Sequence, residues 1–328
     1  MAARFAAACL VVSVFSFAPL ATAQMPASPP QAPPAGYVAP RTSYGAPSIE
    51  GMWTTNFILP MEASARTPTL TLPETDAKAM AELLAGEIAA SFDAQLDPEV
   101  PVNIKNTRGL AIVRGERRTR AVVQPADGRL PYTPEARKET VTGAPAKYDN
   151  YEERPNWERC ITNLGLPPIT FMGSTNIRHI VQTPSHVVLR TEYGDEVRII
   201  PFAAAHRPRE LHTVLGDSIA RWDGDTLVIE TIGLPNKDRK RAFGNNLLVP
   251  GDGTVIERLT RVSDTEIVYQ FSVVDPQVYH APWLAEYSMY RSNQPNYEHA
   301  CHEGNYSLPN ILRGARVIEA RGAGKAPR

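Results

Sequence analysis

The chain of 328 residues lacks the motifs that mark several common classes of enzyme. It has no G-x-G-x-x-G after a strand-like run, no G-x-x-x-x-G-K-[ST], no H-E-x-x-H and no G-x-S-x-G. These absences disfavour nucleotide cofactors, zinc peptidase chemistry and α/β-hydrolase chemistry. We therefore expect no cofactor and no bound metal.

The sequence also has no excess of charge of one sign. Lys and Arg number 34 against 35 Asp and Glu, and loss of the first 23 residues would remove only Arg4 from this balance. A net charge near zero gives no reason to expect nucleic acid as a partner. After residue 23, no apolar run reaches the ~20 residues of a membrane-spanning helix, so we expect no transmembrane segment in the mature chain. The oligomeric state is left open.

The first 23 residues have the pattern of a secretory signal peptide. Arg4 precedes an apolar run over residues 5–20, and residues 21–23 supply a small-x-small cleavage site before Gln24. An uncleaved membrane anchor is the alternative, but the apolar run is short for one. The sequence therefore predicts a periplasmic or secreted protein.

Cysteine is scarce, and its few positions are informative. Of the three cysteines, Cys9 lies within the predicted signal peptide, which leaves Cys160 and Cys301 in the exported chain. An even pair in an oxidising compartment favours a disulfide. Two buried free thiols are the alternative.

The composition divides the mature chain into a lead-in and one domain. Residues 24–47 are rich in Pro, Ala, Gly and Ser, which predicts a disordered or extended lead-in. Residues 48–328 are enough for a single large β-rich domain. Six prolines punctuate residues 131–170, so the segment 131–175 is predicted to be a loop that wraps the core.

Two segments show helical spacing. A helix near residues 74–96 is predicted from a Pro-Glu-Thr-Asp start at Pro73 and from four apolar residues at every fourth position, Met80, Leu84, Ile88 and Phe92. The apolar spacing between Leu308 and Ala320 predicts a short C-terminal helix that docks on the sheet.

Most of the chain after residue 176 alternates as β-strands do. Tight-turn signals such as Tyr193-Gly194-Asp195 separate several of the runs, and short links imply antiparallel neighbours. We predict a mainly β fold, an antiparallel barrel or sandwich, with a lipocalin-like barrel favoured. The predicted strands are Ile177–Gln182, His186–Thr191, Glu196–Pro201, Ser218–Trp222, Thr226–Thr231, Val255–Val262, Glu266–Val274 and Leu284–Arg291.

A basic, strand-like stretch covers residues 104–128. Arginine alternates there with apolar residues, which is the usual pattern of a solvated sheet face. An anion-binding wall is the second interpretation, although no phosphate-cradling glycine loop accompanies it. The arginines concerned are Arg108, Arg114, Arg117, Arg118 and Arg120.

The densest polar cluster lies near the C-terminus, over residues 298–306. Glu298 and His302 could move protons near neutral pH, because imidazole beside carboxylate suits acid–base chemistry. A metal site is a second interpretation, but in a strand His299 and His302 would face opposite ways. A third is a structural knot, in which Cys301 is bridged and the polar groups cap the last helix.

Two further clusters surround strand connections. Prolines in residues 275–283 present Tyr279, His280 and Trp283 close together, as at the mouth of a small-molecule pocket, with rim packing as the alternative. A third cluster runs from His206 to Arg221 and includes His212 and Asp217. Arg221 and Asp217 could simply form an ion pair.

Residues 216–227, Gly-Asp-Ser-Ile-Ala-Arg-Trp-Asp-Gly-Asp-Thr-Leu, resemble the G-D-S-I-x-R-W-x-G-D-T-L signature of a large, poorly characterised family of exported bacterial proteins. The similarity continues in residues 127–134, 159–160 and 279–283, and in the Cys-His-Glu-Gly-Asn-Tyr of residues 301–306. The resemblance brings no catalytic assignment. The family usually has an aromatic residue at position 299, which counts against His299 as a shared metal ligand. Separately, Gly51-Met52-Trp53 is similar to the G-x-W opening of lipocalin-like barrels.

Acid–base chemistry is what remains for an enzyme without a cofactor, metal or evident nucleophile. We predict an exported, cofactor-independent lyase or isomerase that acts on a small aromatic substrate. A lipocalin-like carrier of a small apolar ligand and a structural envelope protein are the alternatives. The predicted catalytic residues are Tyr279, His280, Glu298, His302 and, as anion partner, Arg221. The predicted substrate contacts are Trp222, Trp283 and Tyr306.

Overall fold

The computed structural model describes seven stretches of the chain, with gaps between them. They are residues 36–93, 109–141, 148–162, 165–169, 177–236, 239–241 and 247–322. The predicted signal peptide and residues 24–35 of the predicted lead-in lie outside these described residues. Within them, no helix combines the length and hydropathy needed to cross a bilayer.

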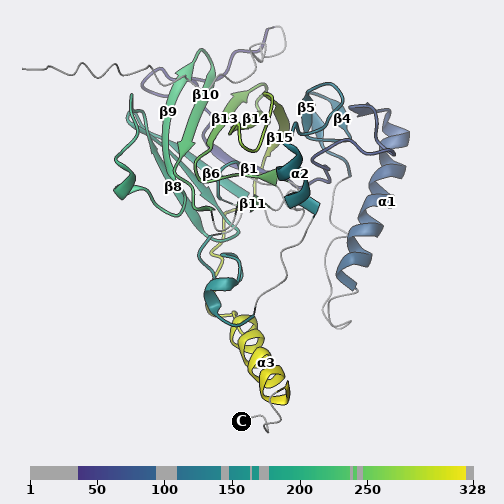
Figure 1. Cartoon of the computed structure of the whole chain (residues 1–328). Coiled ribbons are helices and arrows are strands. Elements are labelled where there is room, and N and C mark those ends of the chain that lie inside the picture. The colour runs from purple at the N-terminus through teal and green to yellow at the C-terminus, as the bar shows by residue number, and fades with distance from the viewer. Residues whose placement is uncertain are drawn as a thin grey trace, which may run out of the picture.

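The centre of the described structure is one antiparallel sheet (Figure 1). Nine strands follow one another in the order β8-β7-β6-β1-β15-β14-β13-β10-β9, and β5 (Val122–Gln124) pairs with β15. The strands of the path are β1 (Gly51–Thr54), β6 (Ile177–Gln182), β7 (His186–Thr191), β8 (Glu196–Pro201), β9 (Asp217–Asp223), β10 (Thr226–Ile232), β13 (Thr254–Arg261), β14 (Glu266–Val274) and β15 (Leu284–Arg291).

All eight predicted strands form, with bounds within one residue of those predicted. Strand β8 shows why: Glu196, Arg198 and Ile200 are buried, while Val197 and Ile199 between them are exposed. This period of two places alternate side chains on opposite faces of the sheet. The prediction of a mainly β, antiparallel fold is thus confirmed.

The sheet curls until its two edge strands lie next to each other. A single parallel bridge, Phe202 with Ala220, joins the end of β8 to β9. A hydrogen bond of 3.2 Å from Arg198 to the Ser218 hydroxyl adds a side-chain contact. No longer ladder between these two strands occurs in the described residues, and we call the junction the seam.

The inner side of the curled sheet is filled by large side chains and by a segment of the chain itself. Trp53, Tyr269 and Tyr287 are fully buried there. The backbone N–H of Ile169 donates to the Tyr269 hydroxyl at 2.8 Å, and the Tyr287 hydroxyl donates to the Ile169 carbonyl at 2.6 Å. Residues 165–169, predicted to be part of a loop that wraps the core, are therefore buried inside the sheet.

The first predicted helix is confirmed as α1 (Glu74–Asp93). Its Ala77 and Ala81 pack with Ile58 and Leu110 in a small core beside the main sheet. A three-stranded sheet lies next to it, with the strands β2 (Thr71–Leu72), β4 (Glu116–Arg118) and β3 (Ile112–Val113). A two-stranded ladder joins β11 (Lys240–Arg241) and β12 (Leu247–Leu248).

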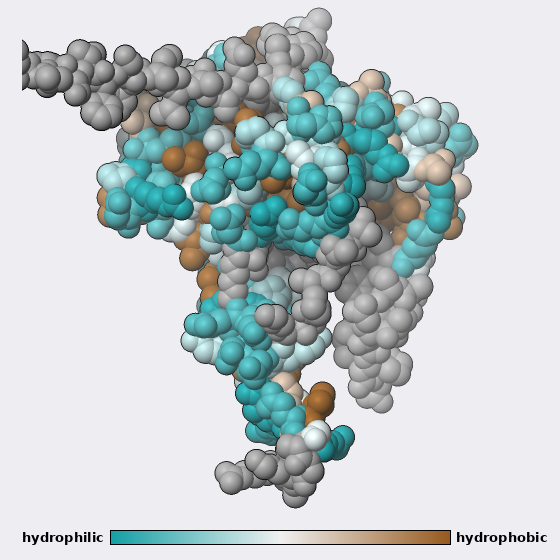
Figure 2. Space-filling model, viewed as in Figure 1, coloured by the Kyte–Doolittle hydropathy of each residue, from teal (hydrophilic) through white to brown (hydrophobic). Residues whose placement is uncertain are grey.

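The C-terminal helix forms as α3 (Ser307–Gly322), but its predicted docking on the sheet is wrong. Figure 1 shows α3 projecting away from the sheet, and none of its residues is buried. Figure 2 shows hydrophobic surface beside hydrophilic surface on this projecting part. An amphipathic pattern predicts that a helix has an apolar face, and it does not specify which surface covers that face.

Two predicted loops have more structure than expected. Residues 36–47, assigned to the disordered or extended lead-in, pack on the strand connections: Arg41 forms a 2.7 Å ion pair with Asp225, and Gln182 donates to the Pro47 carbonyl. The predicted wrapping loop contains α2 (Pro134–Val141) and a short 3-10 turn at Tyr151–Glu153.

The basic stretch forms no free anion-binding wall in its described part. Arg117 is bonded to Glu74, and Arg118 forms a 3.1 Å ion pair with the buried Glu286. Arg120 donates to the carbonyls of Pro68, Val122 and Ala126. These guanidinium groups are held by the chain's own oxygens, although Nε of Arg118 has no hydrogen-bond partner among the described residues. Arg108 lies outside the described residues.

Candidate functional site

The predicted aromatic pocket wall at residues 279–283 is instead part of the core. The Tyr279 hydroxyl donates to the Leu248 carbonyl at 2.6 Å, and its ring stacks on Tyr132 with centroids 4.9 Å apart. Burial raises the pKa of Tyr279 well above its ordinary value. Trp283 is fully buried and packs edge-on against Phe271. Both side chains therefore hold the β14–β15 connection against the core. Helix α2 contributes Ala136 to the same core.

The described contacts do not bring the other predicted catalytic residues together. His280 is exposed in the β14–β15 connection, where its backbone N–H donates to the Pro131 carbonyl. Glu298 and His302 are exposed in the connection from β15 to α3, and Tyr306 is 74% exposed just before α3. No described hydrogen bond or ion pair joins these groups, so a pocket shared by them stays a prediction.

The C-terminal cluster instead has the features of the structural knot. Cys160 and Cys301 form the predicted disulfide. Asn305 donates to the Glu158 carbonyl at 2.8 Å and accepts from the backbone N–H of Leu308, which caps α3. The His299 ring packs on Tyr193 with centroids 4.4 Å apart, the contact an aromatic residue would make. Across the described residues, no group of three or more His, Cys, Asp or Glu side chains could hold a metal ion.

The remaining two predicted residues, Arg221 and Trp222, line a pocket at the seam. Its volume is about 650 Å³, and it lies between strand β9, the chain that follows β8 and the ordered end of the lead-in. The lining residues are Tyr44, Ala46, Pro184, Phe202, Ala203, Ala204, Ile219, Ala220, Arg221, Trp222 and Glu230.

The seam pocket combines an apolar wall with two opposite charges. Phe202 and Trp222 stack with ring centroids 6.3 Å apart and are only partly buried. Arg221 is exposed, and its guanidinium group makes no hydrogen bond or ion pair with any described residue. Glu230 supplies a carboxylate on the neighbouring strand β10. Such a wall with few polar groups is typical of small-molecule sites.

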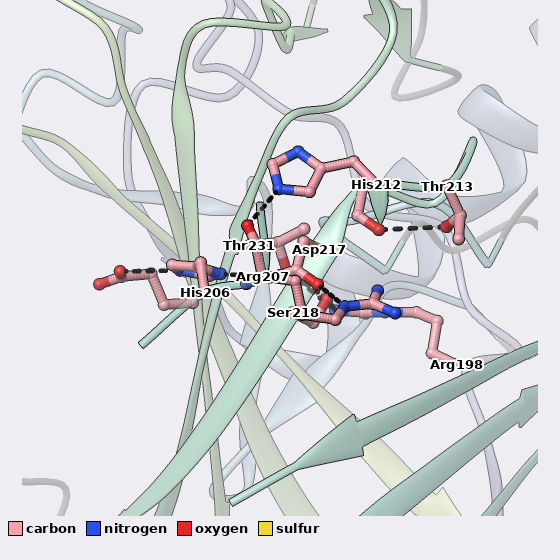
Figure 3. Close-up of polar contacts among 10 residues, drawn as sticks. Arg198, His206, Arg207, His212, Thr213, Asp217, Ser218 and Thr231 are labelled. Atoms are coloured by element: carbon pink, nitrogen blue, oxygen red, sulfur yellow. Dashed lines mark hydrogen bonds and ion pairs between the residues drawn. The ribbon is translucent and has the colours of Figure 1, made fainter. Parts of the chain in front are cut away.

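A histidine joins the pocket carboxylate to a buried carboxylate (Figure 3). His206 Nε2 lies 3.1 Å from Oε1 of Glu230, and His206 Nδ1 lies 2.8 Å from Oδ2 of Asp217. The side chain of Asp217 is 2% exposed, that of His206 15%, and that of Glu230 35%. The three groups form a path from the protein interior to the pocket, which we call the Asp–His–Glu relay.

Asp217 is held in its ionised form. Burial alone would raise its pKa, but hydrogen bonds from the Arg207 side chain and backbone and from His206 outweigh it, so the pKa of Asp217 is below its ordinary value.

The suggested ion pair of Asp217 with Arg221 is wrong. Four residues along a strand span about 13 Å, so these two side chains share a face but cannot touch.

The loop that carries His206 is fixed at its other end by His212. Nε2 of His212 lies 3.0 Å from the Arg207 carbonyl oxygen (Figure 3), and its ring covers Gly233. A Cβ atom on Gly233 would lie 2.0 Å from His212 Nδ1, and Gly233 has φ +67°. Gly233 therefore allows the close approach that holds the loop over the strands.

Comparisons with known proteins add little to this geometry. No protein-family model and no curated protein matches the sequence. The chain is similar to the crystal structure of the fatty acid-binding protein from brain tissue of Drosophila melanogaster, with 16% identity over 42% of this chain and 91% of that protein. The TM-score is 0.23, too low for the likeness to bear on fold or ligand.

Proposed function

We propose that the protein binds a small ring-bearing anion in the seam pocket and moves a proton on it without a cofactor. The observation that carries the proposal is the position of Glu230, which lines the pocket and is joined through His206 to the buried Asp217. Arg221 would bind the anionic group, and Phe202 and Trp222 would contact the ring.

The relay suits general acid–base catalysis. His206 lies between two carboxylates, with Nδ1 near Asp217 and Nε2 near Glu230, which is the arrangement of a proton relay. His206 can then supply a proton to Glu230 or take one back while Glu230 exchanges a proton with the ligand. Proton transfer of this kind suits an elimination or an isomerisation, so a lyase or an isomerase is the proposed class.

This proposal gives most of the catalytic roles to residues other than those predicted from the sequence. Arg221 keeps its predicted role as anion partner, and Trp222 keeps its predicted role as a substrate contact. His206, Asp217 and Glu230 take the acid–base role that the sequence assigned to Tyr279, His280, Glu298 and His302.

Export from the cytoplasm and membership of the family described above are also proposals. A disulfide between Cys160 and Cys301 supports an exported protein, periplasmic or secreted, because such bonds persist in oxidising compartments. Membership of the family of exported bacterial proteins is proposed on the motifs alone. The lipocalin-like barrel is also proposed, since the sheet curls until its edges meet at the seam.

Binding of anilinonaphthalenesulfonate, a ring-bearing anion with a fluorescence signal, tests the pocket. We expect Arg221→Gln to weaken the affinity about tenfold, the loss of ~1.4 kcal/mol. The matched control is Arg190→Gln, because Arg190 is a partly exposed arginine on strand β7 that is paired with Asp195. Equal affinity of the Arg221 variant and the wild type would refute the anion site.

Turnover separates an enzyme from a carrier. Small molecules captured from a cell extract by the purified mature protein would be incubated with it and followed by mass spectrometry. An enzyme converts a captured compound, and Glu230→Gln should slow the conversion by about 10²-fold or more. Release of every captured compound unchanged would favour the carrier.

A further inference from the structure

The ordered end of the lead-in forms one wall of the seam pocket. We call residues 41–47 the flap. The backbone N–H of Thr42 donates to the Ala46 carbonyl at 2.9 Å, and a β-bridge between the two ends of the flap closes it into a turn. Tyr44, at the tip of this turn, and Ala46 line the pocket. The flap therefore adds an aromatic ring to the two that β9 and the chain after β8 supply.

The base of the flap is fixed, whereas its tip is exposed. The backbone N–H of Ser48 donates to the Pro40 carbonyl at 2.7 Å, and that of Ile49 donates to the side-chain oxygen of Gln182 at 2.7 Å. At the tip, residues 43–45 are all exposed. The fixed base provides a hinge, so that the tip can move while the strands stay in place.

One ion pair holds the flap against the β9–β10 turn. Arg41 lies 2.7 Å from Asp225, and their side chains are 46% and 34% exposed. Among the described residues, it is the one hydrogen bond or ion pair between the flap and this hairpin. An ion pair this exposed favours the closed position by about two- to fivefold. The pair therefore biases the flap towards the closed position and is weak enough to break readily.

The opposite walls of the pocket are harder to move. Arg221 and Trp222 belong to β9, and Glu230 belongs to β10, and these strands pair along their whole length. Moving these residues would break hydrogen bonds of the ladder, whereas lifting the flap breaks one exposed ion pair and uncovers Tyr44. The flap is thus the wall that opens at the lower cost.

We propose that the flap is a gate of the seam pocket, which closes on the ligand through Tyr44 and is held shut by the Arg41–Asp225 ion pair. The ligand is the ring-bearing anion of the proposed function, so the inference rests on that function. Closure would exclude water from Glu230 and strengthen the attraction between the ligand anion and Arg221.

The gate is tested first without a ligand, by acrylamide quenching of Trp222 fluorescence. Of the other tryptophans, Trp53 and Trp283 are fully buried and Trp157 is 56% exposed. A Trp157→Phe background therefore leaves Trp222 as the accessible indole. In this background, Arg41→Gln should raise the quenching constant by up to about fivefold, because the open position becomes more populated.

Arg258→Gln is the matched control for Arg41→Gln. Arg258 forms a 2.8 Å ion pair with Asp223, beside the same turn, and none with the flap. Its substitution should leave the quenching constant unchanged. About 1 M salt reduces the screening length to ~3 Å and should increase quenching in the wild-type flap more than in Arg41→Gln. Equal quenching in the Arg41 and Arg258 variants would overturn the gate.

Stopped-flow release of anilinonaphthalenesulfonate tests the contact with a ligand. Tyr44→Ala should raise the dissociation rate constant by about tenfold, the size of one aromatic contact. Arg41→Gln should raise both the association and the dissociation rate constants. Val38→Ala is the control, because Val38 lies just before the flap, is 75% exposed and does not line the pocket. Unchanged release from Tyr44→Ala would overturn the gate.

The gate and the proposed function fail in different ways. If Arg221→Gln weakens binding while the flap variants change neither quenching nor release, the gate is wrong and the anion site stands. If Arg41→Gln increases the quenching of Trp222 but the wild type binds no anilinonaphthalenesulfonate, the flap is a movable cover and the proposed ligand class is wrong.

Discussion

Two clusters of charged side chains, one inside the curled sheet and one at its seam, use similar groups in different ways. Inside, Arg198 forms a 2.6 Å ion pair with Glu257, and the Tyr269 hydroxyl donates to the same carboxylate at 2.7 Å. All three side chains are almost completely buried. At the seam, exposure increases stepwise from Asp217 through His206 to Glu230.

The difference shows what burial does to a carboxylate. Glu257 has its oxygens occupied by its own chain and no path to a ligand, so its charge holds strands β8, β13 and β14 together. Glu230 receives one bond from His206 and lines the pocket. Substitutions should therefore lower stability in the interior cluster and alter function at the seam.

Glu257→Gln should have the largest effect on stability. It leaves the Arg198 guanidinium buried without its counter-charge, and breaking a buried ion pair costs about 3–5 kcal/mol. Urea denaturation followed by far-ultraviolet circular dichroism measures the loss. A variant within about 1 kcal/mol of the wild type would show that the interior pair is not a structural element.

Asp217→Asn should have the next largest effect. Hydrogen bonds to a charged group contribute about 1.5–3 kcal/mol, and Asp217 accepts them from both Arg207 and His206. Because the folded-state pKa of Asp217 is lowered, its charge stabilises the fold above the ordinary carboxyl range. This contribution is lost as the pH falls through the ordinary and then the folded pKa.

The pH profile is the specific check for Asp217. The difference in unfolding free energy between wild type and Asp217→Asn should be constant above about pH 5 and shrink below about pH 4. A difference that does not depend on pH would contradict an ionised Asp217.

Gly233→Ala should cost about 1–2 kcal/mol, since an L-residue is strained in the left-handed region. The new methyl group would also displace His212 and loosen the loop that carries His206. Thermal unfolding measures the cost, and binding of anilinonaphthalenesulfonate reports the pocket. Gly224→Ala is the control, because Gly224 has φ +59° and no atom near its missing Cβ. Equal binding in the two variants would separate the loop from the pocket.

Glu230→Gln should have the smallest effect on stability, within about 0.5 kcal/mol, because Glu230 is partly exposed. Its effect on turnover should be large, as proposed above. A loss of stability close to that of Glu257→Gln would remove the distinction between the two clusters.

The sequence predicts the sheet well because its signals are local. The alternation in β8 and the turn at Asp223-Gly224-Asp225 each depend on a few neighbouring residues. That turn also sets the register of the two strands that carry part of the site. With Thr226 opposite Asp223, Glu230 must lie opposite Ile219, on the same face as Asp217 and Arg221.

The position of His206 could not be predicted from such local signals. His206 lies in a loop, 24 positions from Glu230 in sequence, and no periodicity fixes where a loop side chain points. Tyr279 and Trp283 were misassigned for a related reason: the prolines around them signal a strand connection, but burial of that connection depends on Tyr132 and Leu248. Tyr132 and Leu248 are both distant in sequence from Tyr279.

The odd number of strands in the path determines how its two edge strands meet. Nine strands with antiparallel neighbours alternate in direction, so the first and the last, β8 and β9, run the same way. Their junction can only be parallel, with slanted hydrogen bonds that are slightly less stable per residue. Amide protons along β9 should therefore exchange with solvent earlier than those of β14 in the middle of the sheet. We therefore expect the sheet to open most easily at the seam, where the pocket lies.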